Sequence, residues 1–214
     1  MSWTDRIPFC SADVVTILYL SNMKIETLEI AGLRGVLEAL RLPFNKGARS
    51  RTEFKWSQGM RGDGLTDVAP LRVMYLTSLD IDPRDISLME TLVKRGDEHA
   101  KAIRGIVVYA KITAPIFFFI EEETYRVGHE RLSSESTMHG VARGLVGDDL
   151  QRVKSNLPMG TELTKVDYFS YQTLRRIVIQ RNGHRLAEWR QFIDWVRTLP
   201  LSRELIFCGT DVPF

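Results

Sequence analysis

Cysteine is scarce in this sequence of 214 residues, since only Cys10 and Cys208 occur, close to opposite ends of the chain. Neither has a second cysteine at the short spacing that a zinc site or a redox dithiol requires. This usage favours a reducing compartment, so we expect a cytoplasmic protein.

Long apolar runs are also missing. The apolar run near the N-terminus, Val14–Leu20, is short, contains a threonine and a tyrosine, and lacks a basic leader. It therefore fits neither a signal peptide nor a membrane span, and we interpret it as a strand. We expect no membrane partner.

Neither sign of charge is in large excess, because the 29 lysines and arginines nearly balance the 27 aspartates and glutamates and leave a net charge of +2. No global field then selects DNA, RNA or an anionic membrane as a partner. The 44% of hydrophobic residues is ordinary for a chain with a packed core. We expect one domain over residues 23–214, preceded by an N-terminal extension over residues 1–22 that ends before a second methionine, Met23.

Familiar catalytic motifs are missing as well. The sequence holds no Gly-x-Ser-x-Gly elbow, no lysine after a glycine-rich phosphate loop and no Rossmann glycine fingerprint. The histidines are scattered without a pair at i, i+4 or a recognisable metal motif; they are His99, His129, His139 and His184. We predict no metal site, and a bound flavin would not be held by a Rossmann domain.

Two segments in the first half of the chain have an irregular composition. Ser57–Pro70 is rich in glycine, which predicts a surface loop. Phe44–Trp56 interleaves lysines and arginines with aromatic residues, and such a segment can grip phosphate and stack on a planar ring. A solvated edge with its aromatic residues packed underneath would have the same composition, so both interpretations stay open.

Periodicity and capping signals predict several elements. Met23–Glu29 alternates like a half-buried strand. Asp82 and Pro83 open a helix, with the aspartate as cap and the proline in the first turn, and Gly96 supplies its stop. The residues between them form one apolar face, consisting of Ile86, Met89 and Val93.

The middle of the chain predicts a sharp change from strand to helix. Ile106–Ile112 is β-branched and aromatic, which is typical of a core strand. It runs into Thr113–Pro115, which we interpret as a capped helix start. The helix that follows, Pro115–Tyr125, is so rich in bulky apolar residues that we expect it to be too apolar for the surface of a monomer.

The C-terminal segment predicts a helical hairpin. Apolar residues recur at helical spacing on both sides of a break at Asn182 and Gly183. We assign to the polar faces of this hairpin the basic residues Arg175, Arg176, Arg181, His184, Arg185 and Arg190. Together these elements predict strands and helices in a single α+β domain.

The segment from Thr124 to His139 is the best candidate for a site, because it concentrates polar side chains after the predicted helix. Arg126 and Arg131 can pair with phosphate oxygens, the neighbouring hydroxyls can donate to others, and Glu135 can orient a pyrimidine or ribose edge. A hydrophilic turn would have the same composition, and the residues alone do not choose between them.

Several stretches of the sequence resemble flavin-dependent thymidylate synthases. Leu92–His99, the strand after it and Ala114–Phe117 agree in order and spacing with the part of that family that leads into its Arg-His-Arg signature. Thr124-Tyr125-Arg126 takes the place of the signature, so only its last arginine is matched. Ser133-Ser134-Glu135-Ser136 sits where the family has an Asn-Glu-x-Ser run that holds the nucleotide phosphate.

The resemblance continues toward the C-terminus and covers the chain from about Met23 to Pro200. Leu157-Pro158 and Arg181 keep the spacing of the family's Leu-Pro and of its nucleotide-binding arginine. His184–Trp189 is similar to its closing His-x-Gln-x-Glu region, with Glu188 in place of the glutamate.

The resemblance implies a thymidylate synthase-like fold, in which a mixed or antiparallel sheet of a single α+β domain is packed by long helices, and it implies the chemistry of that family. The family is a homotetramer with flavin sites at subunit interfaces, reduces FAD with NADPH and passes a one-carbon unit from methylenetetrahydrofolate to dUMP. Because the flavin does the chemistry, no protein nucleophile is expected, and no catalytic residue is assigned. The implied cofactor-binding residues are His99, Thr124, Tyr125, Arg126, Ser170, Gln172 and Arg176, and the implied substrate-binding residues are Ser133, Ser134, Glu135, Ser136 and Arg181.

The departures from the family leave the product open. The first arginine and the histidine of the signature are replaced, and Ser170 and Gln172 stand where the family has an Asn-x-Arg pair on its flavin. We expect transfer of a methyl or hydroxymethyl group to a pyrimidine deoxynucleotide such as dUMP or dCMP, of the kind that phages and other viruses use. The alternatives are a protein of this fold that lost flavin chemistry and binds a nucleotide or nucleic acid, and a purely structural oligomeric protein.

Overall fold

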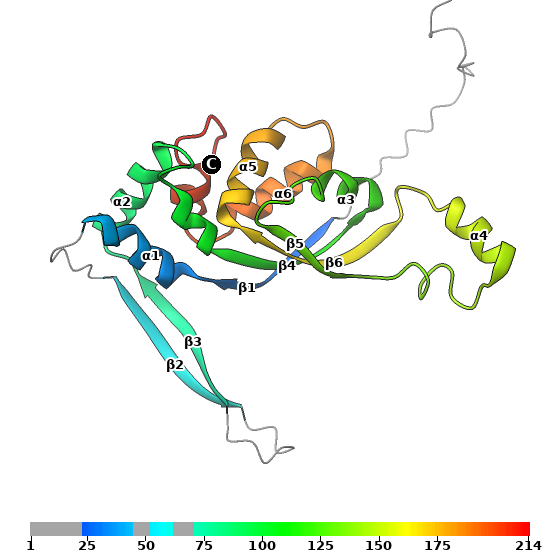
Figure 1. The fold of residues 1–214 in the computed structure, drawn as a ribbon, viewed down its shortest axis with the longest axis horizontal. Helices are drawn as coiled ribbons and strands as arrows, with labels where there is room; N and C mark the ends of the chain where they lie inside the picture. Colours follow the sequence, from blue (N-terminus) through cyan, green and yellow to red (C-terminus); the bar gives the residue numbers. More distant parts are fainter. Residues whose placement is uncertain (1–22, 45–51, 62–70) are drawn as a thin grey trace, which may run out of the picture.

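The computed structural model describes residues 23–44, 52–61 and 71–214, so the predicted strand Val14–Leu20 lies outside the described residues. The chain forms an elongated body with two projections, a β-ribbon at one end and an arm at the other (Figure 1). In chain order the elements are β1 (Lys24–Ala31), α1 (Leu33–Arg41), η1 (Leu42–Phe44), β2 (Glu53–Arg61), β3 (Leu71–Asp80), α2 (Pro83–Lys94), η2 (Lys101–Gly105), β4 (Val107–Pro115), α3 (Ile116–Glu122), β5 (His129–Ser134), α4 (Gly147–Ser155), β6 (Glu162–Ser170), α5 (Tyr171–Arg181), α6 (Ala187–Arg197) and η3 (Arg203–Phe207).

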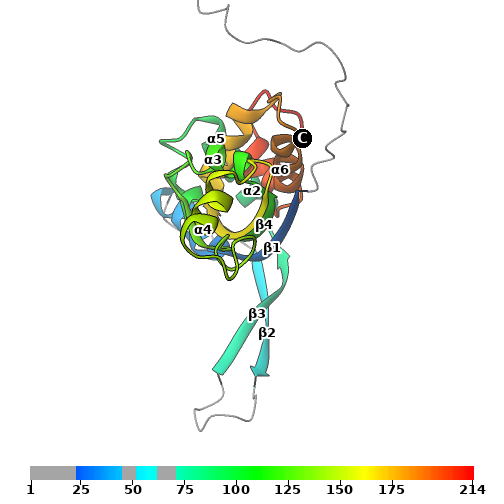
Figure 2. The same cartoon turned by 90° about the vertical axis from the view of Figure 1, so that its right-hand side faces the viewer.

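The body is built on a four-stranded antiparallel sheet in the order β1-β4-β6-β5. The predicted α+β class is therefore confirmed, with an antiparallel sheet. The strands β2 and β3 pair with each other in a separate sheet, which stands away from the body as a ribbon (Figures 1 and 2). Within the main sheet β5 is an edge strand, which leaves one side of its backbone unpaired by the described strands.

The sheet buries one face because its strands alternate. In β4 the side chains of Val108, Ala110 and Ile112 are fully buried, whereas Tyr109 between them is half-buried and Lys111 is exposed. Successive residues of a strand point to opposite faces, so one face packs against helices and the other stays partly open. Figure 1 shows α3, α5 and α6 on the same side of the sheet.

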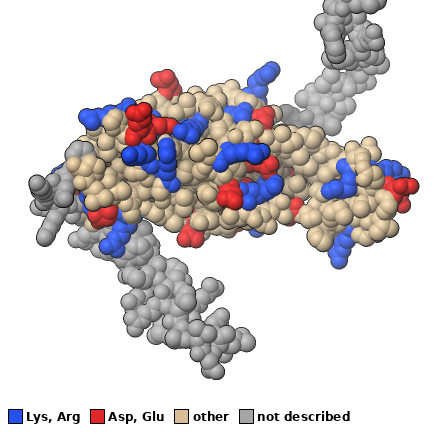
Figure 3. Space-filling view, in the orientation of Figure 1, with Lys and Arg blue, Asp and Glu red and all other residues tan. Residues whose placement is uncertain are grey.

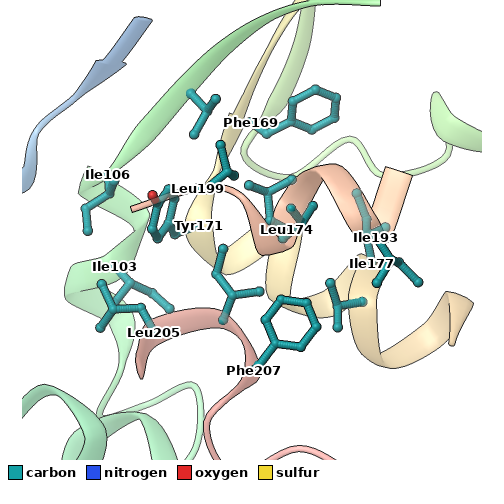
Figure 4. Packing of buried hydrophobic residues seen from close by; sticks show 14 of the residues in the cluster. Ile103, Ile106, Phe169, Tyr171, Leu174, Ile177, Ile193, Leu199, Leu205 and Phe207 are labelled. Carbon is teal, nitrogen blue, oxygen red and sulfur yellow. The ribbon is translucent and has the colours of Figure 1, made fainter. Parts of the chain in front are cut away.

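The core lies between that sheet face and the helices. Phe169 at the end of β6 packs with Tyr171, Leu174 and Ile177 of α5, while residues of η3 close the core from below (Figure 4). An aromatic cluster extends it toward α3 and α6, with ring centroids 4.8 Å apart for Phe118 and Trp189. This core fixes the start of α5 and the end of α3, the two segments that bear the candidate site.

The predicted helix 83–94 forms as α2, and its capping signals are confirmed. The Asp82 side chain accepts a hydrogen bond from the Arg84 backbone N–H at 3.0 Å. Gly96 adopts a φ of 100°, which residues with a side chain rarely adopt, and so ends the helix. The predicted strand Met23–Glu29 forms as β1, and the C-terminal hairpin forms as α5 and α6.

Some sequence predictions were wrong in detail. Ser57–Pro70 is not a loop from its start, because residues 57–61 continue β2 and pair with β3, while residues 62–70 lie outside the described part. No side chain caps α3, whose N-cap is Pro115, since Thr113 still belongs to β4. Among the bulky α3 side chains, Phe118 and Phe119 are buried in the core, whereas Ile120 is 55% exposed.

Arg175 corrects the prediction for the hairpin. We placed it on a polar face, but it is buried and its guanidinium donates to the carbonyl oxygens of Ile206 and Cys208, both at 2.7 Å. It holds η3 against α5 and takes no part in a basic surface. The prediction rested on the charge of the residue alone. The guanidinium can be buried because two backbone carbonyls accept its hydrogen bonds.

The arm consists of the connection between β5 and β6 and carries α4. No residue of α4 is buried, and in Figure 1 the helix lies beyond the end of the body. In the part of the chain that the structure describes, no helix has both the length and the apolar character needed to cross a membrane.

Candidate functional site

The turn between α3 and β5, residues 123–128, is the centre of the candidate site. Gly128 has a φ of 75°, which allows the chain to reverse into β5. The hydroxyl of Thr173 at the start of α5 donates to the Val127 carbonyl at 2.6 Å, and the Gly128 carbonyl accepts from the Ser170 N–H at 2.6 Å. The turn is therefore held against the N-terminus of α5.

A cavity of about 300 Å³ lies between this turn and α5, and we call it the arginine cavity. It brings together five of the residues that the sequence resemblance assigned to ligands, contributed by segments about 50 positions apart. Its lining consists of Thr124, Tyr125, Arg126, Val127, Thr173, Arg176, Gln180 and Arg181. Guanidinium groups beside a phenol ring are suited to a phosphate and a planar base.

Arg181 is held from several sides. Its guanidinium donates to the Tyr125 hydroxyl at 2.7 Å and to Glu121 Oε2 at 2.8 Å, and it lies 4.6 Å from the ring centroid of Trp189. The same Glu121 oxygen also accepts from the Trp189 indole N–H at 2.9 Å. The charge of Arg181 is therefore already balanced, and the residue orders the wall of the cavity.

The other two arginines of the cavity differ from each other. Arg176 pairs with Asp97 at 2.9 Å, which ties α5 to the turn after α2, where the exposed His99 also lies. Arg126 is exposed, and no ion pair is found for it among residues 23–44, 52–61 and 71–214. Its guanidinium is therefore the most available of the three for an anionic ligand.

A second cavity, of about 440 Å³, lies on the other side of the turn, and we call it the histidine cavity. It shares Arg126 with the arginine cavity, so this side chain lies between the two. The remaining lining residues are Glu123, Gly128, His129, Glu130, Arg131 and Tyr168. A ligand longer than either cavity could lie across both of them past Arg126.

Three ionisable side chains form a cluster, the buried triad, at the inner end of the histidine cavity. The triad consists of Glu122 at the end of α3, His129 at the start of β5 and Asp167 in β6. His129 Nε2 lies 2.7 Å from Glu122 Oε1 and 4.0 Å from Asp167 Oδ1. The shorter distance is that of an ion pair, but its direction does not satisfy a hydrogen bond.

Burial shifts the pKa values of the triad. Burial, followed by the neighbouring Glu122, raises the pKa of Asp167 to about 7, against the opposing effect of His129. For His129, burial lowers the pKa, but Glu122 and Asp167 outweigh burial, so the net pKa lies above its ordinary value. At neutral pH the Asp167 carboxyl is therefore on the border of ionisation, and the two carboxylates favour the protonated form of the imidazole.

Next to the triad, Lys165 is buried and pairs with Glu123, and its ammonium lies 4.0 Å from the centroid of the Phe119 ring. Burial raises the pKa of Glu123, but Lys165 and then Arg131 outweigh it, so the net pKa lies below its ordinary value. The positive charge of Lys165 is therefore balanced by Glu123.

The serine segment lies apart from both cavities. Ser133, Ser134 and Ser136 are exposed on the edge strand β5 and just beyond it. Glu135 is tied to β6, since its carboxylate accepts from the Thr164 N–H at 2.8 Å. Glu135 and Ser136 line a third cavity, of about 360 Å³, at the base of the arm. Neither of them lines the arginine cavity or the histidine cavity.

Ser170 and Gln172 lie inside the protein. The Ser170 hydroxyl accepts from the Thr173 N–H at 3.2 Å and so caps α5. Gln172 is buried and its side-chain oxygen accepts from Arg104. Both residues support the turn and the start of α5, and neither lines the arginine cavity or the histidine cavity.

Sequence reasoning missed Glu122 and Asp167. Asp167 carried a readable signal, because it alternates with Lys165 and Phe169 on the buried face of β6. No local pattern relates Glu122 to either partner, since the three residues belong to three separate elements. His129 was known as one of four scattered histidines, and only the fold shows its surroundings.

No protein-family model and no curated protein matches the chain. Solved structures do match. Thymidylate synthase X from Helicobacter pylori, solved with FAD and dUMP, has a TM-score of 0.57 and 10% identity, over 87% of this chain and 99% of that one. A second structure of the Helicobacter pylori flavin-dependent enzyme complexed with FAD and dUMP has a TM-score of 0.56 and 10% identity, over 86% and 99% of the two chains.

The UMP/dUMP methylase PolB from Streptomyces cacaoi, bound with 5-Br dUMP, is also similar, with a TM-score of 0.53 and 14% identity over 90% of this chain and 97% of that one. These proteins match nearly over their whole length. The resemblance seen in the sequence is thus confirmed at the level of the fold.

Proposed function

Because the chain folds as flavin-dependent thymidylate synthases do, we propose that it binds FAD and a pyrimidine deoxynucleotide and transfers a methyl or hydroxymethyl unit to the base. The observation that carries the proposal is the arginine cavity, in which Arg126 is the one guanidinium without an ion pair in the described part of the chain. Solved structures of the same fold contain FAD with dUMP, or 5-Br dUMP.

The residues of the cavity fit the anionic part of such ligands. The Arg126 side chain can donate two parallel hydrogen bonds to phosphate, a geometry that a guanidinium provides and an ammonium does not. Tyr125 offers a ring edge, while Arg181 and Glu121 keep that ring in place from behind. We assign Thr124, Tyr125, Arg126 and Arg176 to the flavin or its phosphates.

When bound, FAD reduced by NADPH would supply the two electrons that convert the one-carbon unit of methylenetetrahydrofolate to a methyl group, whereas transfer of a hydroxymethyl unit would need no net reduction. The protein then has to bind, orient and exclude water, which agrees with a site rich in arginine and hydroxyl groups and poor in nucleophiles. Arg126 would also stabilise negative charge on a ligand next to it, and the effect would be strongest where the bound ligand excludes water from the exposed guanidinium.

The serine segment and Arg181 remain our proposed contacts for the nucleotide. Within one chain the serine segment lies at the base of the arm, away from Arg181. A second copy of the chain could bring the two together, so we propose that the site is completed in a homotetramer. Support comes from the partly open sheet face and from apolar side chains of the arm that are at least half exposed, namely Val141, Val146 and Met159.

Substitution of Arg126 tests the proposal. We expect Arg126→Ala to weaken FAD or dUMP binding by roughly 10- to 100-fold, because a charge-assisted hydrogen bond contributes about 1.5–3 kcal/mol. Flavin absorbance and calorimetry with dUMP and dCMP measure both ligands. Arg190→Ala is the matched control, since Arg190 is equally exposed but lies outside both cavities.

Two outcomes would contradict the proposal. The first is equal affinity of wild type and Arg126→Ala for every ligand, and the second is a colourless wild-type protein that binds no flavin but associates with nucleic acid in a steeply salt-dependent manner. Figure 3 speaks against the second, since lysines and arginines on that face alternate with acidic residues and form no continuous basic stripe.

A further inference from the structure

The buried triad of Glu122, His129 and Asp167 is not used by the proposed transfer reaction. Both carboxylates are completely inaccessible to solvent, and His129 exposes only 8% of its surface. Their oxygens accept no hydrogen bond from any group in the described part of the chain. Buried carboxylates are normally satisfied by hydrogen bonds or by a cation, and the single imidazole of His129 cannot satisfy both of them.

The orientation of His129 shows what kind of partner fits. Its Nδ1 lies 3.2 Å from the Tyr125 carbonyl oxygen, and because a carbonyl can only accept, Nδ1 carries the hydrogen. The ring is held flat against Phe169, with centroids 4.5 Å apart and an interplanar angle of 3°. Nε2 is therefore fixed toward the two carboxylates, as in metal sites where a backbone carbonyl orients the ligating imidazole.

We infer that Glu122, His129 and Asp167 bind a divalent transition-metal cation, with Nε2 and one oxygen from each carboxylate as ligands. The three donor atoms lie within 4.8 Å of one another, and the two measured separations from Nε2 are 2.7 and 4.0 Å. Donors that bind a tetrahedral ion at about 2.1 Å lie about 3.4 Å apart, so both separations from Nε2 are within about 0.7 Å of the value that a tetrahedral site requires.

The donor set and the surroundings select the kind of ion. One imidazole and two carboxylates suit Zn²⁺, Co²⁺, Mn²⁺ or Fe²⁺, whereas Mg²⁺ and Ca²⁺ prefer oxygen ligands alone. A dication would balance both carboxylates at once, which one imidazole cannot do. Because His129 also lines the histidine cavity, a fourth ligand such as water could reach the ion from there.

The experiment uses the full chain without a histidine tag, stripped with a chelator and then supplied with Zn²⁺ or Co²⁺. We expect one ion per chain by elemental mass spectrometry after gel filtration, without flavin or nucleotide. Since second-shell changes alone cost 10- to 100-fold in metal affinity, Asp167→Asn and Glu122→Gln should each lose at least about 100-fold. His139→Gln is the control, because His139 is exposed and distant from the triad in the fold.

Stability and spectroscopy keep the test decisive where a variant folds poorly. In the wild type, Zn²⁺ at 100 times its dissociation constant should raise the melting temperature by roughly 5–10 °C. X-ray absorption of the bound ion should show one imidazole, oxygen ligands and no sulfur. A wild type that takes up no ion, an ion with a sulfur ligand, or affinity that Asp167→Asn leaves unchanged would each overturn the assignment.

Discussion

Arg181→Ala separates the two roles that this arginine can have, as a ligand for phosphate or as a support for the cavity wall. The sequence resemblance assigns it to the nucleotide. In the structure its guanidinium is bound to Glu121 and Tyr125 and stacks on Trp189. Arg181→Ala therefore removes the guanidinium that donates to the Glu121 carboxylate, which still accepts from the Trp189 indole N–H. It also removes the hydrogen-bond donor to the Tyr125 hydroxyl.

The magnitude follows from these contacts. The cation–π contact contributes about 0.5–2 kcal/mol, and the hydrogen bond to the Tyr125 hydroxyl about 0.5–1.5 kcal/mol. The pair with Glu121 is discounted to about 1 kcal/mol, because 19% and 34% of the two side chains are exposed. We expect a loss of roughly 2–4 kcal/mol, and each kcal/mol lowers the melting temperature by about 2–4 °C in a chain of this size.

Thermal and urea unfolding measure the loss, and a cycle with Glu121→Gln isolates the pair, since glutamine can still accept from Trp189. Coupling of about 0.5–3 kcal/mol is expected for side chains in contact. Arg126→Ala is the control and should stay within about 0.5 kcal/mol of the wild type. If Arg181→Ala is as stable as the wild type but binds dUMP more than tenfold more weakly, the support role is refuted and the guanidinium is a ligand for phosphate.

Two further predictions concern the turn and the assembly. Gly128→Ala should lower the free energy of unfolding by about 1–3 kcal/mol more than Gly183→Ala does. Both glycines have a φ near 75°, but a Cβ at Gly128 would lie 2.5 Å from the Ser170 hydroxyl, whereas a Cβ at Gly183 would have no heavy atom within 4 Å. Equal free energies of unfolding for the two variants would contradict this packing of the turn. Sedimentation of the purified chain at micromolar concentration should show a tetramer. A clean monomer would contradict our proposal that a second copy of the chain completes the site.

Local sequence signals predicted the elements well where a few neighbouring residues decide the conformation. The cap and proline at Asp82-Pro83, the stop at Gly96 and the break at Asn182-Gly183 all appear at the expected positions. They work because capping, φ restriction and helical periodicity act over a few residues. The start of α3 was less clear, since Thr113 is equally suitable for a strand and for a cap, and pairing with Thr164 kept it in β4.

The sequence predicted only part of the candidate site, because local signals act over a few neighbouring residues. Thr124–Arg126 and Arg181 could be matched to a family pattern, and the fold places them around one cavity. The same pattern assigned Ser133–Ser136 to that site, but pairing of β5 at the edge of the sheet carries these residues to the base of the arm. Which strand a segment pairs with depends on the whole sheet, and local composition does not contain that information.

The sequence by itself determined the α+β class, most of the helices and the likeness to flavin-dependent thymidylate synthases, because periodicity, caps and motif order are written along the chain. Only the tertiary structure decided how charge is used. It buried Arg175 against η3, neutralised Arg181 with a carboxylate 60 positions away and left Arg126 without an ion pair in the described part of the chain. It also gathered the buried triad from three elements, since burial and charge pairing depend on contacts between segments that are distant in sequence.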